Sequence, residues 1–128
     1  QLTAQNEGLE LVIAINYSGR WDVVNAAKQV AQKVQSGLLS SSDIDEEVLS
    51  QHLQLHDLPD PDLLIRTSGE KRLSNFLLWE LAYTEIFFTK VYWPDFNEAV
   101  FDQAIACYLS RERRFGKTGE QLQQEGYA

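Results

Sequence analysis

The residues best suited to chemistry lie in one segment, P-D-P-D-L-L-I-R-T-S-G-E-K-R-L-S-N at 59–75. An apolar stretch at 63–65 predicts a short strand that ends in an arginine and a donor-rich loop. Ligands of open α/β sheets bind beyond the carboxyl ends of the strands, where this loop would lie. The donors expected to converge, with free amides around Gly69, are Arg66, Thr67, Ser68, Arg72 and Ser74. Because guanidinium groups match phosphate oxygens in pairs, the loop predicts capture of a phosphate or diphosphate. An arginine-capped structural turn is the alternative.

The elements that must position this loop follow the order β-α-α-β-α-β-α. Leu9–Ile15 is a nearly continuous apolar run, which predicts a strand covered on both faces. An amphipathic helix begins near Asp22 and stops at Gly37, and Ser41 or Ser42 caps a second helix. After the strand at 63–65, we expect a helix at about 76–84, a strand at 85–91 and a last helix at about 97–115.

This order predicts an α/β fold with a parallel sheet, right-handed crossovers and flanking helices. Three parallel strands make a thin sheet, and parallel sheets need both faces and both edges protected. We therefore expect the C-terminal half of a larger Rossmann-like single domain. That part covers residues 1–117, and 118–128 form a polar tail expected to be disordered.

Composition narrows the class of partner. The chain has 128 residues and a net charge of −8, which argues against nonspecific binding of nucleic acid. Cys107 is the single cysteine, so a reduced, cytoplasmic setting is expected. No stretch approaches the roughly 18 apolar residues of a membrane span. The basic residues concentrate in two clusters, at 66–72 and 111–117, which suits a small anionic ligand.

Five motifs carry a resemblance to a known family: N-Y-S-G-R at 16–20, P-D-P-D-L-L-I-R-T-S-G-E-K-R-L-S-N-F-L-L-W at 59–79, A-Y-T-E at 82–85, W-P-D-F at 93–96 and R-E-R-R-F-G at 111–116. Together they resemble the cis-prenyltransferases (isoprenyl transferases), of the bacterial undecaprenyl diphosphate synthase type, over about 8–117. The family's D-G-N-G-R-W phosphate loop, its essential aspartate and most of its hydrophobic tunnel have no counterpart in this sequence. One departure is Ser18, where the family usually has glycine; serine fits unless this position needs a positive φ.

The resemblance assigns a binding role to three residues of the central loop. Arg66, Arg72 and Ser74 are expected to hold the diphosphate of isopentenyl diphosphate. No catalytic residue is expected here, because the essential aspartate belongs to the absent half. The segment is therefore expected to be inactive alone.

The resemblance also implies a metal and a second subunit. Glu85 matches the family's acidic residue associated with Mg²⁺, although a lone carboxylate is ordinarily just solvated. Arg114 and Gly116 match an R-x-G element that reaches the neighbouring subunit's diphosphate in a homodimer. Without the resemblance, the basic residues at 111–114 are explained as favourable charges at a helix C-terminus.

The implied function is a prenyltransferase of isoprenoid biosynthesis. It condenses isopentenyl diphosphate with an allylic diphosphate such as farnesyl diphosphate. The product is a long cis-polyprenyl diphosphate such as undecaprenyl diphosphate, the lipid carrier precursor for cell-wall synthesis. The enzyme is expected in the cytoplasm, with transient association to the membrane surface through its lipid product. A noncatalytic subunit of a heteromeric cis-prenyltransferase and a general anion-binding module stay as alternatives.

Overall fold

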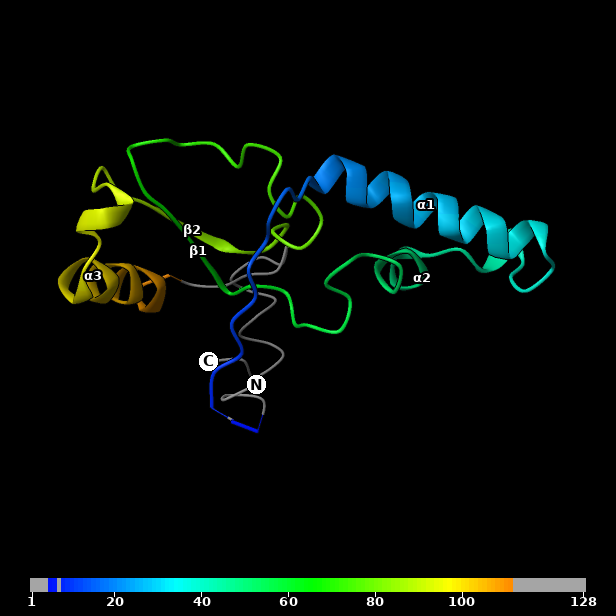
Figure 1. The fold of residues 1–128 in the computed structure, drawn as a ribbon, viewed down its shortest axis with the longest axis horizontal. Coiled ribbons are helices and arrows are strands. Elements are labelled where there is room, and N and C mark those ends of the chain that lie inside the picture. Colours follow the sequence, from blue (N-terminus) through cyan, green and yellow to red (C-terminus); the bar gives the residue numbers. More distant parts are fainter. Residues whose placement is uncertain (1–4, 7, 112–128) are drawn as a thin grey trace, which may run out of the picture. The chain divides into compact units, whose positions relative to one another are not determined.

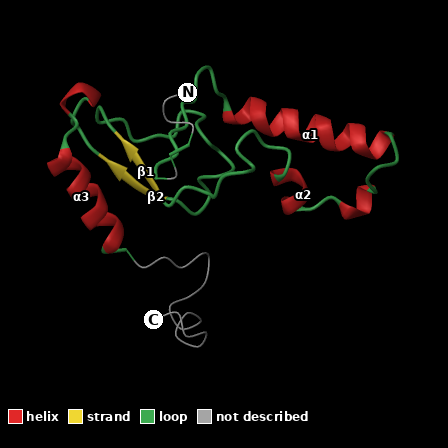
Figure 2. Ribbon diagram, turned by 60° about the horizontal axis from the view of Figure 1, so that its bottom comes forward, coloured by secondary structure: helices red, strands yellow, loops and turns green. Residues whose placement is uncertain are grey.

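The computed structural model describes residues 5–6 and 8–111 (Figure 1). The chain divides into two compact units, Gln1–Gln54 and Leu55–Ala128. Figure 2 shows their helices and strands by type. In the described part, no helix is long and apolar enough to cross a bilayer.

The first unit is built on helix α1 (Gly19–Gln35), which begins three residues before the expected Asp22 and ends just before Gly37, as predicted. The Ser18 hydroxyl accepts a hydrogen bond from Trp21 N at 3.3 Å and caps the first turn. Ser18 has a φ of −142°, so serine fits this position without strain. At the other end, Gly37 has a φ of +73°, and Leu38 N donates to Lys33 O at 2.9 Å. These two features define a Schellman motif, in which glycine is the usual residue at the left-handed position.

The second expected helix is interrupted. Ser41–Asp43 form the 3-10 turn η1, and helix α2 covers only Glu46–Ser50. The break arises because Asp45 caps α2, its carboxylate accepting from Val48 N at 2.8 Å. Helix α2 packs against α1. The buried apolar side chains of this unit are Ala26, Val30 and Leu53.

The prediction of a strand at 9–15 is wrong, because the structure has no strand in these residues. A strand needs a hydrogen-bonding neighbour, and the sheet of the described residues has two strands elsewhere in the chain. The apolar side chains of this run are therefore exposed instead of covered, with Leu9 at 87% and Ile15 at 83%.

The second unit contains the sheet. Strands β1 (Leu63–Arg66) and β2 (Glu85–Phe88) pair in parallel, with Leu63 opposite Glu85 and Arg66 opposite Phe88. The α/β class and the parallel pairing are thus confirmed, although the sheet has two strands instead of three. The β2 strand is also shorter than the expected 85–91.

The prediction of a helix at 76–84 is also wrong, since this segment consists of bends and turns (Figure 2). Leu77 has a φ of +43°, which a right-handed helix does not allow. Leu77 and Leu81 are nevertheless buried in this segment of turns.

The last elements in the described part of the second unit are the 3-10 turn η2 (Trp93–Asp95) and helix α3 (Glu98–Leu109), which packs against β2. The Asn97 side chain caps α3 by accepting from Val100 N at 3.2 Å. The helix is shorter than the expected 97–115. Ser110 follows as its C-cap and donates its hydroxyl to Cys107 O at 2.7 Å, a local bond that competes with helix continuation.

Candidate functional site

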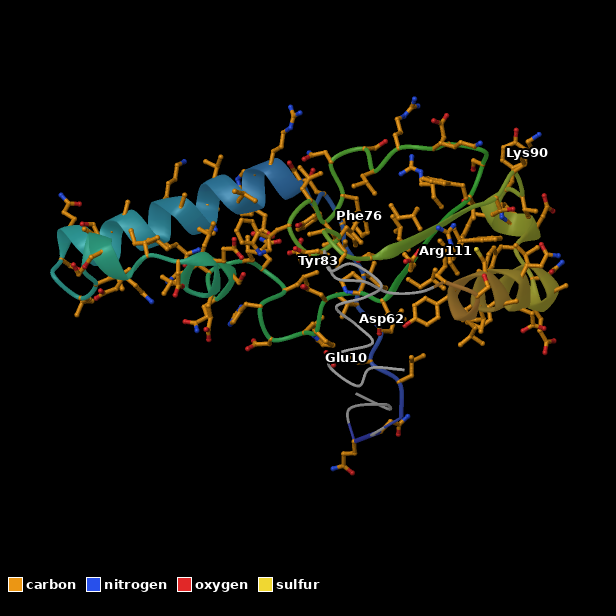
Figure 3. All side chains as sticks on the ribbon, turned by 180° about the vertical axis from the view of Figure 1, so that it is seen from behind. Glu10, Asp62, Phe76, Tyr83, Lys90 and Arg111 are labelled. Atoms are coloured by element: carbon orange, nitrogen blue, oxygen red, sulfur yellow. The ribbon has the colours of Figure 1, made fainter. Side chains whose placement is uncertain are left out.

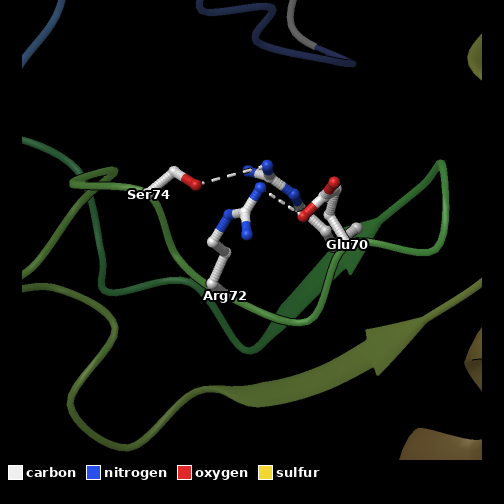
Figure 4. A network of polar contacts seen from close by, with 4 residues as sticks. Glu70, Arg72 and Ser74 are labelled. Carbon is white, nitrogen blue, oxygen red and sulfur yellow. Dashed lines mark hydrogen bonds and ion pairs between the residues drawn. The ribbon is translucent and has the colours of Figure 1, made fainter.

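The loop after β1 brings two of the predicted ligand residues together. Arg66 is the last residue of β1, and its Nη2 donates to Ser74 Oγ at 3.4 Å (Figure 4). The loop therefore folds back, so that residues eight positions apart present a guanidinium and a hydroxyl side by side. This arrangement can donate to an anion at the carboxyl end of the strand.

The second arginine of the loop is already engaged. Arg72 Nη2 lies 2.6 Å from Glu70 Oε2, and both side chains are substantially exposed, at 69% and 41% (Figure 4). Exposed ion pairs contribute only about 0–1 kcal/mol, so a multivalent anion can displace the Glu70 carboxylate. Sequence reasoning did not foresee this pairing, although a glutamate two residues from an arginine was a signal for it.

The expected free amides around Gly69 are not free. Ser68 N donates to Val91 O at 2.9 Å, and Gly69 N donates to Thr89 O at 2.8 Å. The pairing of the two strands thus continues beyond β2 into the loop. Side chains, not these two amides, must therefore provide the anion contacts.

The loop stores backbone strain at three non-glycine positions. Ser68, Ser74 and Asn75 have φ values of +67°, +50° and +66°. Each left-handed residue costs about 1–2 kcal/mol relative to the right-handed region. Non-glycine residues in the left-handed region persist only where the surrounding structure holds them there, and they are common at ligand-binding sites. Ser74, the hydroxyl partner of Arg66, is one of them.

Glu85, the candidate metal ligand, lies at the other end of the sheet. It is the first residue of β2 and sits opposite Leu63, whereas Arg66 sits opposite Phe88. The two positions are three residue steps apart, roughly 10 Å along the strands. Glu85 Oε2 lies 3.7 Å from Arg111 Nε, just after α3. The described geometry thus brings Arg66 and Ser74 together and leaves Glu85 apart from them.

Residues 1–116 match a prenyltransferase family model described as "Putative undecaprenyl diphosphate synthase". The chain belongs to the undecaprenyl diphosphate synthase family. Among curated relatives, the "Ditrans,polycis-undecaprenyl-diphosphate synthase ((2E,6E)-farnesyl-diphosphate specific)" of Coxiella burnetii is 57% identical over 95% of this chain and 52% of its own length. The enzyme of the same name in Escherichia coli K12 is 56% identical over 91% of this chain and 46% of its own. The chain therefore spans about half the length of these relatives.

A solved structure shows the same fold in this prenyltransferase family. The crystal structure of lavandulyl diphosphate synthase from Lavandula x intermedia, in complex with dimethylallyl diphosphate, has a TM-score of 0.85 and 47% identity to this chain. The match covers 91% of this chain and 50% of the lavender enzyme. The α/β fold expected from the sequence is thus that of the undecaprenyl diphosphate synthase family.

Two predicted residues of the family's site, Arg114 and Gly116, lie outside the described residues. Arg111, the nearest described residue of their motif, forms the ion pair with Glu85.

The acidic residues of the described part do not by themselves form a Mg²⁺ site. No group of three or more His, Cys, Asp or Glu side chains there could hold a metal ion. Glu85 offers one carboxylate, and the Arg111 guanidinium already lies beside it. Magnesium commonly takes one or two carboxylates together with substrate phosphate oxygens. Glu85 could supply one such carboxylate, and the remaining ligands would have to come from elsewhere.

Proposed function

We propose that this chain is the part of a cis-prenyltransferase that binds the diphosphate of isopentenyl diphosphate. One observation carries the proposal: the Arg66–Ser74 contact, at the carboxyl end of a parallel strand, in a member of the undecaprenyl diphosphate synthase family. On this proposal, residues 1–117 form the C-terminal part of a catalytic domain. The rest of that domain corresponds to the half of the relatives that this chain does not span.

The proposed reaction of the complete protein is stepwise prenyl transfer. The C–O bond of an allylic diphosphate breaks and diphosphate leaves. The double bond of isopentenyl diphosphate attacks the freed carbon to form a C–C bond, and proton loss leaves a new cis double bond. The names of the relatives support farnesyl diphosphate as the allylic substrate and undecaprenyl diphosphate as the product. The segment alone should not complete this reaction.

Three side chains of this chain bind and orient the incoming substrate. Arg66 and Arg72 each offer a planar fork of donors that matches phosphate oxygens. The Ser74 hydroxyl, which now accepts from Arg66, turns to donate to the same diphosphate. Binding requires Arg72 to exchange Glu70 for phosphate, a favourable exchange because the diphosphate carries more negative charge. The diphosphate is thereby fixed while the double bond of isopentenyl diphosphate reacts.

We extend the proposal to Mg²⁺ and a homodimer, as the complete protein would need both. Glu85 would give the metal one carboxylate, and other ligands would have to come from substrate and from residues elsewhere. Arg114 and Gly116 would contact the diphosphate of the partner subunit. The enzyme would work in the cytoplasm and meet the membrane through its lipid product.

Substitution of the two arginines in the natural full-length protein tests the site. In Arg66→Met and Arg72→Met, isothermal titration should give a Kd for isopentenyl diphosphate about ten- to a hundredfold higher, because hydrogen bonds to charged groups are lost. The control Lys28→Met, on α1, removes a positive charge from the first unit and should leave this Kd unchanged.

Three other results would contradict either the proposed site or the proposed class of enzyme. An unchanged Kd in both arginine variants would remove the site. Binding of ATP but not of isopentenyl diphosphate would indicate a general anion-binding module. Binding of isopentenyl diphosphate without condensation onto farnesyl diphosphate, in the full-length protein with Mg²⁺, would indicate a noncatalytic subunit.

A further inference from the structure

Lys90, which the sequence analysis did not consider, lies against the loop that follows β1, the proposed diphosphate site. Lys90 follows β2 and sits between Thr89 and Val91, whose carbonyl oxygens accept from Gly69 N and Ser68 N. These bonds, of 2.8 and 2.9 Å, fix the backbone on both sides of Lys90 to the loop. Its position is therefore set by the same contacts that shape the loop. Figure 3 labels this side chain beyond the end of the sheet.

The side chain of Lys90 runs beside Gly69. A Cβ built on Gly69 would lie 3.8 Å from Lys90 Cγ, which is ordinary van der Waals contact. Gly69 itself has a φ of +73°, so the turn favours glycine here and leaves the lysine stem beside bare backbone. Beyond Cγ the stem is flexible and ends in an ammonium with three donors. The flexible stem lets that ammonium move while Cγ stays beside Gly69.

The charge of the loop leaves a role for another cation. Glu70 offsets Arg72, so the diphosphate meets less positive charge than two arginines suggest. None of the ion pairs among the described residues involves Lys90. Its exposed ammonium therefore has no carboxylate to give up when an anion arrives. A mobile point charge of this kind suits a diphosphate, which carries more negative charge than a monophosphate.

We propose that Lys90 is a third cation of the diphosphate site and that it favours diphosphates over monophosphates. This inference rests on the proposed function of the loop. Lys90 acts on the ligand by charge alone, through its ammonium, whereas the arginines supply directed pairs of hydrogen bonds. Its contribution should fall as ionic strength rises, because an exposed charge is screened within about 10 Å at 0.1 M salt.

The test compares two ligands in the natural full-length protein. Isothermal titration with isopentenyl diphosphate and with isopentenyl monophosphate is run on Lys90→Met, Lys90→Arg and Lys33→Met. Lys90→Met should raise the diphosphate Kd about two- to fivefold at low salt, with a smaller change for the monophosphate. Lys90→Arg should keep most of the affinity because it keeps the charge. Lys33→Met, the control in the last turn of α1, should change neither Kd.

The outcomes separate this inference from the function beneath it. If Lys90→Met leaves the diphosphate Kd unchanged while Arg66→Met raises it, the role of Lys90 is overturned and the site stands. If Lys90→Met weakens both ligands equally, or Lys90→Arg fails to restore affinity, the lysine acts through loop structure and the inference is wrong. If neither Arg66→Met nor Lys90→Met has an effect, the loop is not the diphosphate site.

Discussion

Arg66 Nη2 donates to Ser74 Oγ at 3.4 Å, which joins the end of β1 to the far side of the loop. This contact places the guanidinium beside the loop residue Ser74. Ser74, which accepts this hydrogen bond from Arg66, has a left-handed backbone with a φ of +50°. On the proposed function, an arginine positioned in this way would lose less conformational entropy on binding a diphosphate.

Ser74→Ala should therefore weaken substrate binding while leaving the fold intact. We expect the Kd for isopentenyl diphosphate to rise about two- to tenfold, since one hydrogen bond and the orientation of Arg66 are lost. The thermal unfolding midpoint should hardly change, because Ser74 is exposed. Titration and a thermal melt of the same sample measure both effects. Ser41→Ala, at an exposed serine of η1, is the control.

Glu70→Gln should act in the opposite direction. The substitution removes the carboxylate that lies 2.6 Å from Arg72 and frees this guanidinium for the ligand. The Kd for isopentenyl diphosphate should fall about two- to fivefold, which corresponds to an exposed ion pair. Glu47→Gln in α2 changes net charge equally and should have no effect. Weaker binding in Glu70→Gln would mean that Glu70 supports the loop instead of competing with the substrate.

Asp22→Asn should destabilise the first unit. The Asp22 carboxylate is fully buried and accepts from the Tyr17 hydroxyl at 3.0 Å and from Gln54 N at 3.1 Å. An amide cannot accept on both sides, so either the Tyr17 hydroxyl or the Gln54 amide loses its acceptor. The free energy of unfolding should fall by about 1–3 kcal/mol in a urea titration. Asp102→Asn, at an exposed position of α3, should stay within about 0.5 kcal/mol of wild type.

Ala104→Leu should disturb the packing of α3 on β2. Ala104 has no exposed surface, and a larger side chain would force α3 away from the strand. Overpacking of this kind costs about 1–3 kcal/mol in the free energy of unfolding. Ala106→Leu is the matched control, because Ala106 is exposed on the same helix. Equal stability of the two variants would show that α3 does not need this close contact.

Where residue types alone fix a local conformation, the sequence predicts it. Gly37 was predicted to stop α1, and it does, because a left-handed glycine ends a helix whatever surrounds it. The start of the last helix near Asn97 was also predicted, and the Asn97 side chain caps α3 there. The strand that ends at Arg66 was likewise predictable, since an apolar run is followed there by a donor-rich loop.

Where an element depends on a distant neighbour, the sequence misleads. The run at 9–15 has the composition of a buried strand, but pairing requires a partner strand that composition does not supply. The segment at 76–84 is rich in apolar residues and was predicted to be a helix. Leu77 has a left-handed backbone, and the segment forms a series of turns. Buried apolar residues were predictable there; the backbone that buries them was not.

The sequence by itself determined the family, the parallel α/β class and the donor-rich loop at the end of β1, because these follow from motifs and local chemistry. Only the tertiary structure decided that Glu70 holds Arg72, that the Gly69 amide binds Thr89, and that Lys90 lies beside Gly69. The physical reason is register. Which groups meet depends on how β1 and β2 align and continue past their ends, and that alignment is a property of two chain segments together.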